Sequence, residues 1–134
     1  MAASLYDFNI EKGTSFTLSI VYKNQNNNPI DLTGYCARLV WRTNTGDVTT
    51  FLSTVVSPSE YYFNVDGPTG RITFKLPASA TNSYEFRTAK YDLEIQSDDD
   101  HYAGGGKLTT RILYGTITMI PRNSQEPSLL VCST

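Results

Sequence analysis

Hydrophobic residues recur at every second position over much of this chain. The clearest run is Phe16, Leu18, Ile20 and Tyr22, with mostly polar residues between them. Because successive side chains of a strand point to opposite faces, this period predicts a strand with one buried face. Read along the whole chain, the same alternation predicts about seven or eight strands, over residues 6–10, 16–22, 35–43, 48–56, 61–65, 70–76, 91–95 and 108–120.

Turn-forming residues separate the predicted strands. The segments Asn26-Asn27-Asn28-Pro29 and Asp66-Gly67-Pro68 are strong signals, since Asn and Gly tolerate left-handed backbone conformations and Pro interrupts a strand. Residues 78–86 favour a helix of one or two turns, which Ser79 or Thr81 is able to cap. Short strands at this spacing predict an all-β antiparallel sandwich.

The inward positions of these strands define one core. We predict that it is shared by Leu39, Trp41, Phe74, Leu93 and Ile117. Ile30 and Leu32 are expected to plug this core where the chain crosses over, and Gly34 permits the bend that follows.

The last predicted strand closes the domain. It directs Leu113, Ile117 and Met119 inward, and Gly115 marks a position where another segment packs closely. Pro121 ends the strand, so we expect a β-sandwich domain over residues 1–121 and a C-terminal tail over residues 122–134.

Composition restricts the class of protein. The chain has 134 residues, enough for one core, and its charged fraction of 18% is low. A low charge suits a protein packed against neighbours, but a plain β-domain rich in Thr, Tyr and Val has the same appearance. The 11 basic residues are scattered and the net charge is −2, so neither nucleic acid nor a membrane surface is an expected partner.

The ends and the cysteines add little chemistry. The N-terminus lacks a signal-peptide pattern and no apolar run is long enough for a membrane helix, so we expect synthesis in a cytoplasm. Cys36 and Cys132 have no metal or redox spacing. Two reduced thiols, one buried and one on the tail, are expected; a disulfide requires the tail to fold back onto the strand of Cys36.

Candidate catalytic and metal-binding residues gather in one segment, residues 97–106, which we predict as a loop. His101 follows Asp98-Asp99-Asp100, a combination that invites comparison with a general base or a calcium site. No nucleophile motif and no EF-hand spacing accompany it, and Gly104-Gly105-Gly106-Lys107 lacks the Ser or Thr of a phosphate loop. We therefore expect no catalytic residue, no metal and no cofactor.

Aromatic residues leave one further class open. Trp41, Tyr61 and Phe63 lie at core positions of predicted strands, and Tyr62 should point outward. A carbohydrate-binding module needs exposed aromatic rings, and the candidates for such a role are Tyr62, Tyr84 and Tyr102.

Several phrases, in their order along residues 6–120, carry a resemblance to a known group of proteins. They are Asn28-Pro29-Ile30-Asp31-Leu32-Thr33-Gly34-Tyr35, Gly70-Arg71-Ile72-Thr73-Phe74, Tyr91-Asp92-Leu93-Glu94-Ile95 and Leu113-Tyr114-Gly115-Thr116-Ile117-Thr118. The chain resembles the small Ig-like β-sandwich virion proteins of tailed bacteriophages. It is similar to the N-terminal domains of their baseplate upper proteins and tail-fibre anchors.

The resemblance implies an Ig-like sandwich and a structural role without catalysis. The expected partners are other virion proteins, in many copies, at the tail, baseplate or fibre attachment; a capsid decoration protein and a host-attachment module are the alternatives. Pro29, Asp31, Thr33 and Gly34 then form a structural turn tied by side-chain to backbone hydrogen bonds.

The apolar end of the tail has its own expected role. Leu129, Leu130 and Val131 are too apolar for a purely solvated end and too few to form a core. We predict that the tail is an assembly arm that contacts another subunit of the virion. The alternative is a tail folded onto its own domain.

Overall fold

The computed structural model describes residues 3–54, 61–100 and 106–121. It contains one short helix, α1 (Ala78–Ser83), and the strands β1 (Ser4–Leu5), β2 (Phe8–Glu11), β3 (Phe16–Val21), β4 (Cys36–Thr43), β5 (Val48–Leu52), β6 (Tyr62–Asp66), β7 (Arg71–Leu76), β8 (Thr88–Asp100) and β9 (Lys107–Ile120). No helix in the described part of the chain has the length and apolar character needed to cross a membrane.

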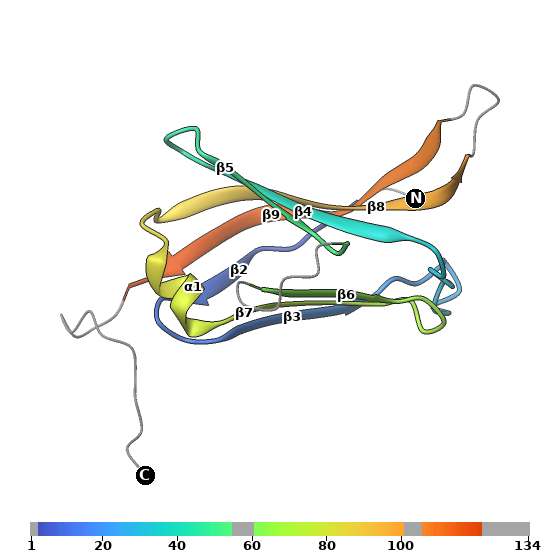
Figure 1. Cartoon of the computed structure of the whole chain (residues 1–134), viewed down its shortest axis with the longest axis horizontal. Coiled ribbons are helices and arrows are strands. Elements are labelled where there is room, and N and C mark those ends of the chain that lie inside the picture. The colour runs from blue at the N-terminus through green and yellow to red at the C-terminus, as the bar shows by residue number, and fades with distance from the viewer. Residues whose placement is uncertain (1–2, 55–60, 101–105, 122–134) are drawn as a thin grey trace, which may run out of the picture.

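The strands form two sheets that face each other (Figure 1). The six-stranded sheet has the order β1-β9-β8-β4-β5, and β2 also pairs with β9. The three-stranded sheet has the order β3-β7-β6. This arrangement confirms the predicted all-β sandwich. The N-terminal strands β1 and β2 run parallel to β9, whereas the other pairs are antiparallel.

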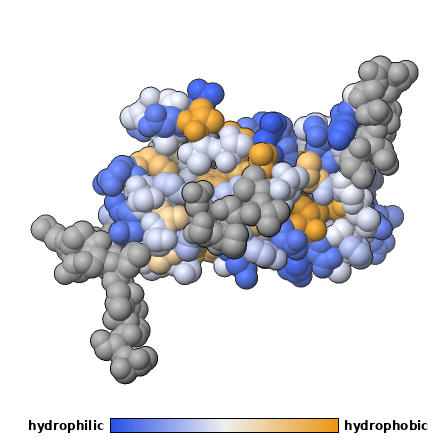
Figure 2. Space-filling view, in the orientation of Figure 1, coloured by the Kyte–Doolittle hydropathy of each residue, from blue (hydrophilic) through white to orange (hydrophobic). Residues whose placement is uncertain are grey.

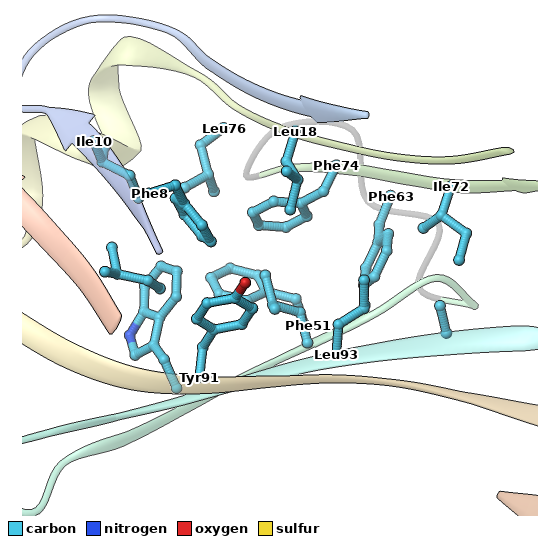
Figure 3. Packing of buried hydrophobic residues seen from close by; sticks show 14 of the residues in the cluster. Phe8, Ile10, Leu18, Phe51, Phe63, Ile72, Phe74, Leu76, Tyr91 and Leu93 are labelled. Carbon is cyan, nitrogen blue, oxygen red and sulfur yellow. The ribbon is translucent and has the colours of Figure 1, made fainter. Parts of the chain in front are cut away.

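The space between the sheets holds one hydrophobic core. All five residues that the alternation assigned to it are buried: Leu39, Trp41, Phe74, Leu93 and Ile117. Aromatic rings bridge the layers, because Phe51 of β5 contacts Trp41 of β4 and Phe74 of the opposite sheet, with ring centroids 4.8 Å and 4.9 Å apart. In Figure 3, Phe63 and Phe74 of the small sheet point toward Phe51 and Leu93 of the large sheet.

The β8–β9 hairpin is longer than the sequence pattern predicted. Residues 97–106 were expected to form a loop, yet β8 continues to Asp100, which pairs in register with Lys107 of β9. The intrinsic reluctance of Asp to form strands is weak, and pairing with a neighbouring strand overrides it. His101, Gly104 and Gly105 lie outside the described residues.

A β-bulge explains a second difference from the sequence pattern, which had assigned Leu113 to the inner face of the last strand. Between Leu93 and Glu94 the register with β9 skips Ile112, because Leu93 pairs with Leu113 and Glu94 with Arg111. A bulge places an extra residue in one strand. Ile112 is therefore buried alongside Ile117 and Met119, and Leu113 is only partly buried against the same core.

The N-terminal segment and the helix also differ from the prediction. Residues 6–10 were expected to form one strand, but Tyr6 and Asp7 separate β1 from β2, and each of these two strands pairs with β9. The helix begins after Pro77 without a side-chain cap, so capping by Ser79 or Thr81 was wrong. The Thr81 hydroxyl instead accepts a hydrogen bond from the Gly13 N–H and lies 2.8 Å from the Thr14 carbonyl, which ties α1 to the β2–β3 turn.

Burial of the core leucines gives a matched test of the sandwich. Leu93 is 2% exposed and Leu5 is 64% exposed. We expect Leu93→Ala to lower the free energy of unfolding by about 2–5 kcal/mol, since it leaves a cavity between the sheets. Leu5→Ala, the same chemical change at the surface, should change it by less than about 0.5 kcal/mol. Urea unfolding followed by Trp41 fluorescence measures both, and equal losses would contradict this core.

Candidate functional site

The predicted structural turn carries the chain from the small sheet to the large one. Ile30 and Leu32 anchor it through backbone hydrogen bonds, from Ile30 N–H to the Tyr22 carbonyl at 2.8 Å and from Leu32 N–H to the Gly67 carbonyl at 2.7 Å. Leu32 is buried as expected, and Pro29 forms an isolated bridge with Lys23. These contacts show how the crossover is held between the two layers.

Asp31 closes the tip of this turn. Its Oδ1 accepts hydrogen bonds from the Thr33 N–H at 2.9 Å and the Thr33 hydroxyl at 2.5 Å, and these bonds hold the pKa of the Asp31 carboxyl below its usual range. Gly34 has a φ of +84°, which a glycine adopts without strain. The contacts described for all four turn residues thus lie within the crossover itself.

The N-terminal strands form a strap along β9, fixed by a buried tyrosine. The Tyr91 hydroxyl donates a hydrogen bond to the Tyr6 carbonyl, and the Tyr6 N–H donates to the Tyr114 carbonyl at 2.8 Å. Burial raises the pKa of Tyr91, and the nearby Tyr6 and Asp7 add to the rise. The sequence pattern placed Tyr91 in a strand and predicted no partner for it. A buried hydroxyl needs a hydrogen-bond acceptor, and this need is the signal that could have pointed to one.

Gly115 makes room for the strap. A Cβ at this position would lie 2.7 Å from Asp7 Oδ1 and closer still to the backbone of Tyr6, so only glycine fits. Asp7 Oδ1 also accepts a hydrogen bond from the Thr116 N–H at 2.8 Å. The close packing expected at Gly115 is therefore confirmed, and its cause is the N-terminal segment.

The outer face of the large sheet carries charged residues of both signs. Arg38 and Glu94 are cross-strand partners that form an ion pair, with 2.6 Å between Arg38 Nη2 and Glu94 Oε1. A second ion pair joins Arg111 Nη1 to Asp92 Oδ1 at 3.1 Å. Exposed pairs of this kind stabilise a fold by at most about 1 kcal/mol each. Figure 2 shows that apolar surface on the visible side occurs in separate patches among polar residues.

The candidate aromatic rings do not form one platform in the described structure. Tyr62 is exposed as predicted, on β6, where Lys75 lies 5.3 Å from its ring centroid. Tyr84, which follows α1, packs edge-on against Trp41 at 5.2 Å and belongs to the rim of the core. Tyr102 lies outside the described residues.

A groove runs beside β5, between that edge strand and α1. Its volume is about 350 Å³. It is lined by Thr49, Thr50, Phe51, Tyr61, Ser79, Ala80, Ser83 and Tyr84. The lining combines aromatic rings with small side chains and hydroxyl groups, which suits an extended peptide better than a metal ion or a charged substrate. No sequence pattern predicted this groove, because it depends on how α1 lies relative to β5.

The remaining predicted residues fall in different places. Leu129, Leu130, Val131 and Cys132 lie outside the described residues, and Cys36 is a partly exposed free thiol on the outer sheet face, where the prediction had it buried. Within residues 3–54, 61–100 and 106–121, no three His, Cys, Asp or Glu side chains are grouped as a metal site requires.

Comparison with known proteins adds no family assignment. The chain matches no protein-family model, and no curated protein is significantly similar to it.

The Tyr91 hydroxyl predicts a pH-dependent stability. The folded state holds its proton more tightly than the unfolded chain, so its stabilising effect is complete below pH 10 and is lost as the pH rises above that value. Tyr91→Phe should lower the free energy of unfolding by about 0.5–1.5 kcal/mol at pH 7, with a smaller difference from the native chain at pH 11. Urea unfolding across this pH range measures the difference; a constant difference would contradict the assigned role.

Gly115 gives a test of the strap itself. We expect Gly115→Ala to displace β1 and β2 from β9, because the added methyl group overlaps the backbone of Tyr6. Amide hydrogen exchange of Phe8–Glu11 should then become much faster. Gly46→Ala is the control for steric overlap, since no atom lies within 4 Å of the added Cβ there. Its φ of +96° makes an alanine strained in the β4–β5 turn, but β4 and β5 pair with neither β1 nor β2, so exchange of Phe8–Glu11 should stay slow. Unchanged exchange in the Gly115 variant would show that β9 tolerates the side chain.

Proposed function

We propose that this protein is a non-enzymatic structural component of a tailed-phage virion, at the tail, baseplate or fibre attachment. The observation that carries the proposal is the long β8–β9 ribbon. β8 has 13 residues and β9 has 14, whereas the three strands of the opposite sheet have five or six. The far end of the ribbon therefore extends past the small sheet (Figure 1).

A projecting ribbon of this kind suits a role in assembly. Two strands alone in water are marginally stable. The part of the β8–β9 ribbon that extends past the small sheet, here called the overhang, is therefore stabilised when a neighbouring subunit covers it. The sandwich behind it is held by one core and a closed crossover turn, which makes it a rigid support. The sequence resemblance described above, which implies an Ig-like domain, supports the same class of protein.

The partners that fit this proposal are other virion proteins in a symmetric, multi-copy assembly. Weak contacts suffice there, because many of them act together. The mixture of charges on the outer sheet face argues for a protein partner over nucleic acid or membrane. The protein would be made in the host cytoplasm and reside in the virion, with the tail residues Leu129, Leu130 and Val131 acting as an assembly arm.

Electron cryo-microscopy of intact particles tests the proposal. We expect density for the sandwich at repeated positions of the tail or baseplate, with the β8–β9 ribbon against a neighbouring subunit. Density on the capsid surface would select the decoration alternative. Absence of the protein from purified particles, with the chain present in infected cells, would reject a virion role.

A further inference from the structure

Strand β5 is an open edge of the large sheet. Hydrogen-bonded pairs with β4 include Thr43 with Asp47 and Ser53 with Ala37, in which an N–H donates to a carbonyl at 2.9 Å and 3.0 Å. Such pairs alternate with non-bonded ones in an antiparallel ladder. The backbone N–H and C=O groups of Val48, Thr50 and Leu52 therefore point away from β4.

The outward backbone groups of β5 differ in whether a described residue contacts them. The Tyr61 hydroxyl lies 3.4 Å from both the N–H and the carbonyl oxygen of Leu52. No described residue makes a backbone hydrogen bond to the outward groups of Val48 or Thr50. Exposed edges of this kind accept additional strands.

Apolar surface lies on both faces of the edge. On the outer face, Val48 is 50% exposed and Leu52 is 38% exposed. On the inner face lies the groove of about 350 Å³ that includes Phe51 and Tyr84. A strand added here would have apolar neighbours on both sides, so it should carry successive apolar residues in place of an alternating pattern.

We propose that the C-terminal segment Leu129-Leu130-Val131 of a second copy of this chain adds as a strand to β5. The segment has three successive apolar residues, as the two-sided edge requires. With Leu129 and Val131 in the groove, Leu130 lies on the outer face beside Val48 and Leu52. This inference rests on the proposed assembly role and specifies one partner and one contact for it. The contact is measured on the purified chain without any virion particle, so this inference and the proposed virion role can fail separately.

The length and position of the tail support this occupant. Thirteen residues follow Pro121, and an extended chain of that length spans about 43 Å. Pro121 lines a small hollow together with Tyr84, which also lines the β5 groove. The tail therefore starts at the end of the sandwich where the groove lies, with ample length to cross to an adjacent copy.

Strand directions favour a second copy as the donor. β9 is antiparallel to β8, β8 to β4, and β4 to β5, so β9 and β5 run in opposite directions with two strands between them. The chain's own tail would have to reverse directly after Pro121 to lie along β5. A tail from another copy reaches the edge without that reversal.

Sedimentation equilibrium of the full chain over a range of concentrations tests the proposal. We expect reversible self-association of the native chain. The tail variant Leu129→Asp/Val131→Asp and the edge variant Val48→Glu should each raise the dissociation constant at least about tenfold. Tyr62→Glu is the matched control, because Tyr62 is also 50% exposed but lies on an edge strand of the other sheet.

Mixing the two defective variants separates this contact from others. The tail variant keeps an intact edge and the edge variant keeps an intact tail, so an equimolar mixture should form one-to-one complexes with near-native affinity. Failure of the mixture to associate, or an edge variant that associates like the native chain, would overturn the proposal.

Amide hydrogen exchange provides a readout that needs no variant of the edge. In the native chain at high concentration, the amides of Val48 and Thr50 should be protected, and the tail variant should lose that protection. A native chain that stays monomeric at all concentrations while these amides are protected would place the tail on its own domain, which overturns the assignment to a second copy.

Discussion

The backbone pairing of β8 with β9 is the interaction on which the rest of this structure depends. β9 also pairs with β1 and β2, and β8 pairs with β4, so these two strands join most of the large sheet. Their register sets Tyr91 opposite Gly115. That pairing leaves space for the backbone of Tyr6 and gives the Tyr91 hydroxyl its acceptor. The attachment of the N-terminus thus follows from the alignment of two strands near the C-terminus.

Much of this fold could be predicted from the period of the sequence. Trp41, Phe74 and Ile117 were assigned to one core from alternation alone, because burial of one face of a strand imposes that period. The crossover turn was also readable, since Asp31, Thr33 and Gly34 have local roles that depend on neighbours in sequence. Interactions of this kind are specified by residues close together in the chain.

Features that depend on distant segments were not readable. The extension of β8 through Asp100 is imposed by β9, and the burial of Ile112 by a register skip opposite Leu93. Thr81 is a residue type that often caps helices, yet its hydroxyl makes hydrogen bonds with Gly13 and Thr14 in the β2–β3 turn. The β5 groove likewise arises only where α1 and the edge strand meet, so no sequence pattern marks it.

The parts of the molecule that suit assembly are those that the core does not use. The overhanging ribbon and the open β5 edge each lack a complete set of neighbours within the described sandwich. In the proposed virion role, contacts between subunits would cover these edges, and each contact can be weak when many copies act together. Cross-linking of intact particles with an amine-reactive reagent, followed by mass spectrometry, tests this account most directly. Lys107, at the start of β9 in the overhanging ribbon, should be linked to lysines of neighbouring subunits. Recovery of Lys107 only in links within its own chain would contradict an assembly role for the ribbon.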